Sequence, residues 1–377
     1  MNLSANWSYP TAVRFGAGRI EQLAEACAAA GMANPLLVTD RGLATLPITE
    51  RARSLVDGAG FFTDVDPNPN EENLAAGIET FRDGKHDGVI AFGGGSALDL
   101  GKLIAFQAGQ SRPVWDFEDI GDYYARADAT AIAPIVAVPT TAGTGSEVGR
   151  AGVLTNSATH EKKIIFHPKM LPSVVIADPE LTVAMPSAVT AGTGMDALAH
   201  CLEAYSSNFY HPMSQGIALE GIRLVLENLP RAFAYPNDIE ARAHMMAAAA
   251  MGAVAFQKGL GAVHALSHPI GAIYGTHHGT TNAVLLVPVL HLNRPVIEAR
   301  IEQLAAYCGI EGGFDGFVQH ITALREFLGI PGTLGELGVH PTDLKDLVAK
   351  ALADPTAGGN PVPLTPAAVK AVFAVAL

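Results

Sequence analysis

The fold of this chain is decided by the stretch GVIAFGGGSALDLGK, which runs from Gly88 to Lys102. Its first part, Gly88–Phe92, is a continuous run of apolar and β-branched residues, which predicts a strand buried on both faces. Three glycines follow directly, and Ala97–Ala108 then has the pattern of a helix. A strand, a glycine turn and a helix in this order indicate one unit of a parallel sheet.

The first half of the chain repeats this alternation. Further apolar runs at Pro35–Thr39, Pro134–Val138 and Ser173–Ala177 predict strands, and Ile20–Ala30 and Glu71–Gly84 have helical patterns. Buried strands separated by helices predict a parallel sheet covered on both faces. Ligands of such sheets bind at the carboxyl ends of the strands, and each of these ends carries Gly, Asp or Thr.

Beyond about Pro186 the strand signals fade, and Ser187 is a plausible N-cap for the first of several helices. The helical patterns of this half are Ala188–Tyr205, Ser214–Asn228, Asp238–Phe256, Ile297–Cys308 and Gly316–Leu328. We therefore predict an α/β domain over residues 1–185 and an all-helical domain over residues 186–377, with a cleft between them.

Composition excludes several classes of protein. The chain has 377 residues, of which 49% are hydrophobic, and a formal charge of −13. This charge argues against nucleic acid and anionic membranes as partners. The longest uncharged apolar run, Met245–Phe256, is too short to span a bilayer, and we see no signal peptide. Three widely spaced cysteines fit a reduced cytoplasmic compartment.

Two loops follow neighbouring predicted strands and have the composition of nucleotide-binding loops. Gly93–Ser96 opens a helix, where backbone N–H groups can approach a pyrophosphate. A plain turn that needs positive φ explains one glycine triplet equally well, and the GxGxxG spacing is not present. Thr140–Glu147 offers hydroxyl groups, although a helix cap at Ser146 is the commoner reading of such a run. Together the two loops favour a dinucleotide site.

Asp40 ends the predicted strand Pro35–Thr39. A carboxylate at this place can accept hydrogen bonds from an adenosine ribose and repel a 2′-phosphate. The alternative is an aspartate that caps a helix or a turn, and position alone favours this alternative.

The stretch Gly261–Pro288 contains four histidines, His264, His268, His277 and His278. His264 and His268 are four residues apart and share one face of a helix. For His268 we favour a role in the site as an orienting residue or a proton relay. For His277 we favour a solvent-facing neighbour of a ligand.

A second acid–histidine pair occurs earlier in the chain. Asp196 and His200 have the same spacing of four on a helix rich in Ala, Gly and Leu. An intrahelical hydrogen bond would explain this pair alone. With His264 and His278 it becomes a set of one oxygen and three nitrogen ligands, which suits divalent iron, zinc, cobalt or nickel. The metal site is then the better interpretation.

Together these motifs resemble the iron-containing (group III) alcohol dehydrogenase family over nearly the whole chain. The first half carries FGAG (Phe15–Gly18), Asp40, DPNPN (Asp66–Asn70), GGGSALDLGK (Gly93–Lys102), PTTAGTGSEV (Pro139–Val148) and ADPELT (Ala177–Thr182). The second half carries GMDALAHCLEAY (Gly194–Tyr205), HALSHPIGAIYGTHHG (His264–Gly279) and GGNPVPLT (Gly358–Thr365).

The resemblance implies a dehydroquinate synthase-like fold, with a Rossmann-like dinucleotide-binding domain and a helical metal-binding and catalytic domain. It implies the metal ligands Asp196, His200, His264 and His278, and it places His268 near the nicotinamide. Its implied dinucleotide contacts are Asp40, Asn68, Gly94, Gly95, Ser96, Asp99, Thr140, Thr141, Thr144 and Lys163. Asp40 matches the position that favours NAD over NADP. The segment after Val148 departs from the family pattern, and Arg150 there could contact an anionic group or form a structural ion pair.

The expected activity is that of a metal-dependent NAD(H) alcohol dehydrogenase or aldehyde reductase. The expected cofactors are NAD(H) and one divalent ion, Fe²⁺ before Zn²⁺, and the expected partner is a small alcohol or aldehyde. A maleylacetate reductase, a glycerol dehydrogenase or a hydroxy-acid dehydrogenase of the same superfamily is the alternative, and a non-enzymatic nucleotide-binding protein is disfavoured. The resemblance also implies a homodimer.

Overall fold

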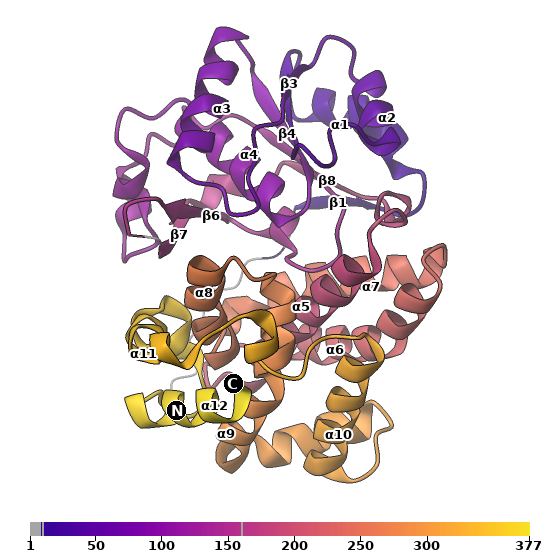
Figure 1. Cartoon of the computed structure of the whole chain (residues 1–377). Helices are drawn as coiled ribbons and strands as arrows, with labels where there is room; N and C mark the ends of the chain where they lie inside the picture. The colour runs from indigo at the N-terminus through magenta and orange to yellow at the C-terminus, as the bar shows by residue number, and fades with distance from the viewer. Residues whose placement is uncertain (1–8, 10, 160) are drawn as a thin grey trace. The chain divides into compact units, whose positions relative to one another are not determined.

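The structure, a computed structural model, describes residue 9 and residues 11–159 and 161–377. These residues divide into two units (Figure 1). One unit comprises Tyr9–Thr141 and Gly145–Ala184, and the other contains Ala142–Thr144 and Met185–Leu377. The grouping of Ala142–Thr144 with the later half of the chain was not anticipated from the sequence.

The first unit is built on a six-stranded sheet in which every neighbouring pair is parallel. Its order is β1 (Ala12–Phe15), β8 (Val174–Ala177), β5 (Ile135–Pro139), β4 (Gly88–Gly93), β2 (Pro35–Val38) and β3 (Gly60–Phe62). The predicted parallel sheet is confirmed. The two edge strands β1 and β3 were not predicted, because they have four and three residues and are not fully buried.

Side chains of the central strands alternate between the two faces of the sheet. Ile90 and Phe92 of β4 belong to a buried cluster with Leu23 of α1 (Leu23–Ala29) and Ala52 of α2 (Pro47–Leu55). Ala91, between them, faces α4 (Gly95–Gln107). α4 lies so close to β4 that a Cβ on Gly101 would be 2.7 Å from the Cβ of Ala91.

α3 packs against α4. A Cβ on Gly77 of α3 (Glu71–Asp83) would lie 2.3 Å from the Cδ1 of Ile104. The sheet is thus covered on both faces, as its apolar strands require.

A separate antiparallel pair follows β5 along the chain. β6 (Ala151–Asn156) pairs with β7 (Glu161–Phe166), in a register that begins with Ala151 opposite Phe166. These strands were missed in the sequence, because Gly152 and a run of charged residues at the start of β7 weaken the apolar pattern that predicts a strand.

The second unit is helical from residue 187 onwards, and the predicted all-helical half is confirmed. Its long helices are α5 (Ser187–Ser206), α6 (Pro212–Ala234), α7 (Ile239–Ala255), α8 (Ala262–Tyr274), α9 (His278–Tyr307), α10 (Gly313–Phe327), α11 (Leu344–Ala353) and α12 (Pro366–Ala376). Ser187 is the first helical residue of α5 and not its N-cap, a position that Pro186 occupies.

The largest departure from the predicted helices is α9. It continues for 30 residues and includes Pro288 and Pro295. The prediction began this helix only at Ile297, because proline usually ends a helical pattern. His278 is therefore the first residue of α9, well ahead of the predicted start of the helix.

α5 is the central helix of this unit, since every residue from Thr190 to Ser206 is buried. α8 is nearly as enclosed, and its residues Ala262–Gly271 are buried with the exception of His268. Among the described residues, no single helix is long and apolar enough to cross a membrane. Two consecutive helical segments, Ile239–Lys258 and Ala262–Tyr274, together have the length and composition of a membrane span. The chain bends by 109° between them.

Candidate metal centre and nucleotide loops

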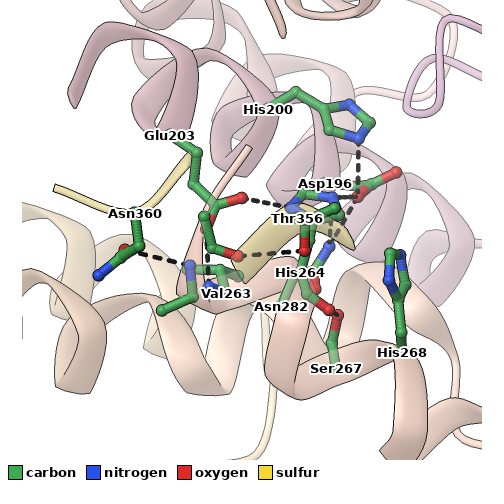
Figure 2. A network of polar contacts seen from close by, with 12 residues as sticks. Asp196, His200, Glu203, Val263, His264, Ser267, His268, Asn282, Thr356 and Asn360 are labelled. Carbon is green, nitrogen blue, oxygen red and sulfur yellow. Dashed lines mark hydrogen bonds and ion pairs between the residues drawn. The ribbon is translucent and has the colours of Figure 1, made fainter. Parts of the chain in front are cut away.

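An acid–histidine cluster lies between α5 and α8. Asp196 and His200 are four residues apart and project from the same face of α5. Oδ1 of Asp196 lies 3.8 Å from Nε2 of His200 and 3.7 Å from Nε2 of His264 on α8. All three residues are buried, and one ligand atom of each lies within 4.8 Å of the others (Figure 2).

His278 approaches the same carboxylate from the start of α9. Its Nε2 lies 3.5 Å from Oδ1 of Asp196. The structure thus places the imidazoles of His200, His264 and His278 around one oxygen of Asp196, although His278 is more exposed than the other three residues.

The distances between these atoms fit a divalent ion. Separations of 3.5–3.8 Å between Oδ1 and the three Nε2 atoms are longer than ordinary hydrogen bonds. Tetrahedral ligands at about 2.1 Å from a shared ion lie roughly 3.4 Å apart. The spacing is therefore close to that of a ligand set, and one carboxylate with three imidazoles is a common set for iron or zinc.

Burial shapes the charge of the cluster. It lowers the pKa of His200 to about 4, so this imidazole is neutral and keeps a lone pair for a metal. Burial alone would raise the pKa of Asp196, but the imidazoles of His200 and His278 hold the pKa below its usual range. Asp196 is therefore an ionised carboxylate inside the protein, and a cation would compensate its charge.

A second carboxylate lies behind His264. Oε2 of Glu203 is 2.5 Å from Nδ1 of His264, and Oε1 of Glu203 accepts a 2.6 Å hydrogen bond from the backbone N–H of Val263. This contact directs Nε2 of His264 towards Asp196 (Figure 2). Although burial opposes it, Glu203 and Asp196 raise the pKa of His264 to about 10, so an ion bound at Nε2 would displace a proton from this imidazole. Glu203 was not predicted as a site residue, although it lies two helical turns after Asp196 on the same face of α5.

Asn282, one turn into α9, was also missed. Its Nδ2 donates a 2.8 Å hydrogen bond to Oδ1 of Asp196 and lies 3.2 Å from Nε2 of His278. Its Oδ1 is buried and has no hydrogen-bond partner among the described residues. Asn282 therefore orients the carboxylate on which the cluster converges.

The remaining two histidines have different surroundings. The ring of His268 stacks on that of His278 with 5.5 Å between centroids, and Nδ1 of His268 lies 2.8 Å from Oδ2 of Asp354. His277 is exposed and caps α9, where its Nδ1 accepts a hydrogen bond from the backbone N–H of Thr280. The ring of His268 therefore lies against the cluster, whereas the side chain of His277 caps the start of α9.

In the other unit, the order of the strands changes direction between β2 and β4. The chain passes from β2 to β3 on one side and returns to β4 on the other side, and ligands of parallel sheets bind at such a switch point. Asp40 follows β2 and the glycine triplet ends β4. A Cβ on Gly93 would lie 3.8 Å from Oδ2 of Asp40, so the two strand ends are neighbours.

The helix α4 begins without a side-chain cap. Gly94 occupies the N-cap position and has no side chain that could accept from the first backbone N–H groups of the helix. A helix N-terminus with unfilled donors favours a phosphate. A Cβ on Gly94 would lie 3.2 Å from the Cγ2 of Thr141, so a larger residue would crowd this turn.

Several predicted contact residues lie beside this turn. Ser96 donates a 2.6 Å hydrogen bond to the carbonyl of Pro67, next to Asn68, and the backbone N–H of Thr140 donates to the carbonyl of Gly93. Thr144 belongs to the segment Ala142–Thr144, which groups with the helical unit.

Two further residues that were predicted to contact the dinucleotide, Asp99 and Asp40, accept hydrogen bonds from other residues of the chain. Asp99 accepts hydrogen bonds from the hydroxyl of Ser146 and the backbone N–H of Val153. Oδ1 of Asp40 accepts from the N–H of Leu43, which is the turn role that its position favoured, while Oδ2 remains beside Gly93.

Two basic residues near the β6–β7 pair also have partners inside the protein. Lys163 forms ion pairs with Glu118 and Glu161. The guanidinium of Arg150 lies 5.3 Å from the ring centroid of Phe166.

Known proteins share both the sequence and the fold. Residues 10–179 match the model of the iron-containing alcohol dehydrogenase family, and residues 190–377 match that of its C-terminal part. The 4-hydroxybutyrate dehydrogenase of Cupriavidus necator is 36% identical over 94% of each chain, and the 1,3-propanediol dehydrogenase of Klebsiella pneumoniae is 37% identical over 92% of each.

Solved structures of known proteins have the same fold as this chain. A 1,3-propanediol oxidoreductase superposes with a TM-score of 0.94 at 35% identity, covering 99% of this chain and 100% of that one. A sulfoacetaldehyde reductase from Bifidobacterium kashiwanohense in complex with NAD+ gives 0.91 at 31% identity, covering 100% and 99%. The chain therefore belongs to the iron-containing alcohol dehydrogenase family.

Proposed function

We propose that this protein is a divalent-metal-dependent NAD(H) oxidoreductase that interconverts a small alcohol and its aldehyde. The buried cluster of Asp196, His200 and His264, in a member of this family, is the observation that carries the proposal. Fe²⁺ is the first candidate ion and Zn²⁺ the second, since both suit mixed carboxylate and imidazole ligands.

Each half of the chain has a separate task in this proposal. Asp196, His200, His264 and His278 would hold the ion, and Glu203 would keep Nε2 of His264 directed at it. When bound, the ion supplies Lewis acidity and the nicotinamide supplies the hydride acceptor or donor. His268 would accept the alcohol proton in oxidation and return it in reduction.

The turn between β4 and α4 would hold the dinucleotide. Backbone N–H groups at Gly95 and Ser96 would donate to the pyrophosphate, with Asn68, Asp99, Thr140, Thr141, Thr144 and Lys163 as further candidate contacts. Asp40 would accept from the ribose hydroxyls, and its charge would disfavour the 2′-phosphate of NADP.

The names of two relatives narrow the substrate class. Both 4-hydroxybutyrate and 1,3-propanediol carry a terminal primary alcohol on a short chain. We infer that this protein acts on a short-chain compound of that kind. The formal charge of −13 argues against nucleic acid as a partner. We further infer that the protein is a homodimer, which light scattering of the purified protein would check. We also infer that it is cytoplasmic.

Metal removal and one substitution test the function. We expect wild-type protein to change NADH absorbance with short primary alcohols or aldehydes, to lose this activity in chelator, and to regain it with Fe²⁺ or Zn²⁺. His264→Ala should lose metal retention and turnover together while its circular dichroism is kept. The control is His320→Ala, on the exposed face of α10, which should retain both. A metal-free His264→Ala protein with full turnover would show the mechanism to be wrong.

A further inference from the structure

α8 carries two histidines that are held in the same manner by different carboxylates. Nδ1 of His264 lies 2.5 Å from Glu203, and Nδ1 of His268, one turn later, lies 2.8 Å from Asp354. Glu203 comes from α5, whereas Asp354 directly follows α11, 86 residues after His268. Glu203 acts on a predicted metal ligand. Asp354 acts on a residue outside the ligand set, so its role has to be a different one.

We propose that Asp354 is a positioning residue for His268, which it holds in the tautomer with the proton on Nδ1 and the lone pair on Nε2. This inference rests on the proposed function, in which His268 carries the alcohol proton. With Nδ1 occupied by Asp354, Nε2 is the atom that accepts the proton, and the reverse transfer returns it from Nε2. Both steps leave the Nδ1–H···Oδ2 hydrogen bond intact.

Asp354 is itself held firmly. The backbone N–H and the hydroxyl of Thr356 both donate to its Oδ1, at 2.9 and 2.6 Å. Oδ1 is thereby occupied, and Oδ2 is the oxygen that faces His268. The side chains of His268 and Asp354 are 20% and 11% exposed, so solvent competes little for their hydrogen bond.

The charge of Asp354 decides which atom donates. Burial would raise the pKa of Asp354, but the hydrogen bonds from His268 and Thr356 lower it below its ordinary value. An ionised carboxylate has only acceptors, so the proton between the two residues belongs to Nδ1 of His268. The opposite tautomer would place a lone pair against a carboxylate oxygen.

The orientation of the ring matters as much as its tautomer. His268 stacks on His278 at an interplanar angle of 15° and meets His264 edge-on, with 5.7 Å between centroids. Its ring therefore lies against two of the predicted ligands. Without Asp354, the imidazole can rotate about its side-chain bonds or exchange tautomers, and in either case Nε2 no longer serves as a fixed acceptor.

Asp354→Asn is the informative substitution, because the amide has nearly the same shape but can donate as well as accept. We expect kcat to fall by about 10–100-fold, as for other residues that orient a functional histidine. KM for the alcohol, the Kd of NADH and the bound metal per chain should change by less than about twofold. Asp354→Glu should recover part of kcat, and Thr356→Val, which frees Oδ1, should lower kcat in the same direction by a smaller factor.

The matched control is Asp346→Asn, an exposed aspartate in the first turn of α11, which should leave every parameter unchanged. A double substitution adds a second criterion. Asp354→Asn in a His268→Ala background should cost no further activity, because the residue acts through His268.

¹⁵N spectra of histidine-labelled, Zn²⁺-loaded protein give a readout independent of turnover. The signals of His268, assigned through His268→Ala, should show a protonated Nδ1 in the wild type and a mixture of tautomers in Asp354→Asn. An unchanged Nδ1 signal in the variant, an unchanged kcat, or a parallel loss of metal would each overturn the proposal. Wild-type protein without NAD-linked turnover would contradict the proposed function alone, since the spectra would still test the tautomer.

Discussion

Gly192 of α5 and Gly279 of α9 are in backbone contact. A Cβ on Gly279 would lie 2.0 Å from the carbonyl oxygen of Gly192 and 3.1 Å from the Cβ of Asp196. This contact brings the start of α9, and with it His278 and Asn282, against the face of α5 that carries Asp196. Two residues without side chains are therefore needed for the cluster to form, although neither supplies a ligand.

Gly279→Ala should separate the two helices and weaken the metal site. The added methyl group cannot be accommodated without moving backbone, which typically costs about 1–3 kcal/mol. We expect a lower midpoint of thermal unfolding and a clear loss of bound metal per chain. Gly216→Ala, in α6 with nothing within 4 Å of the new Cβ, is the control and should retain both. A Gly279→Ala protein with wild-type metal content would contradict this account of the contact.

The sequence predicted the elements that carry local signals. Four strands follow from continuous apolar runs, and the helices α5, α6, α7 and α10 follow from residue periodicity. Asp196 with His200, and His264 with His268, could be paired because a spacing of four places them on one helical face. That the two pairs belong to one site was inferred from their ligand types and implied again by the family resemblance, since nothing local relates residues nearly seventy positions apart.

The contacts and elements that were not predicted from the sequence depend on tertiary structure. Asp354 meets His268 across 86 residues, and Asn282 reaches Asp196 over the same separation, so neither contact leaves a local pattern. α9 runs through Pro288 and Pro295 because the helix is stabilised by packing on α5 and α10, which outweighs the local preference of proline. The short edge strands depend on pairing with β8 and β2 in the same way.

Glu203→Gln should weaken metal binding without loss of a ligand. The amide cannot provide the charge that favours Nδ1–H on His264, so the orientation of Nε2 towards the ion is less strongly maintained. We expect the Kd of Zn²⁺, measured by competition with a chromophoric chelator, to rise by about 10–100-fold. Glu326→Gln, on an exposed position of α10, should bind Zn²⁺ as the wild type does. Equal affinities of the two variants would show that Glu203 has no role at the site.

Asp40→Asn should relax the preference for NAD over NADP. Asparagine retains an oxygen for the N–H of Leu43, so the turn after β2 is preserved while the negative charge is lost. We expect the ratio of kcat/KM for NAD to that for NADP to fall by about tenfold or more, since a like charge no longer opposes the 2′-phosphate. Metal content should be unchanged. If the ratio stays constant, the carboxylate has only its turn role.

Lys258 should make the stability of the protein depend on pH in the alkaline range. The residue is 2% exposed, and its Nζ donates a 3.1 Å hydrogen bond to the carbonyl of Tyr205 at the end of α5. Burial, with a smaller effect of Arg300, lowers the pKa of Lys258 from 10.5 to about 7. Between these two values the unfolded chain binds more protons than the folded one, so the free energy of unfolding should rise with pH.

Urea unfolding of metal-free protein at pH 7 and pH 9 measures this dependence. We expect Lys258 to contribute an increase on the order of 1–3 kcal/mol between the two pH values. Lys258→Met removes the titrating group, so its increase should be smaller than that of the wild type by this amount. Lys370→Met, at an exposed position of α12, should keep the wild-type increase. A pH dependence that is the same in Lys258→Met and in the wild type would mean that the buried ammonium remains charged throughout this range.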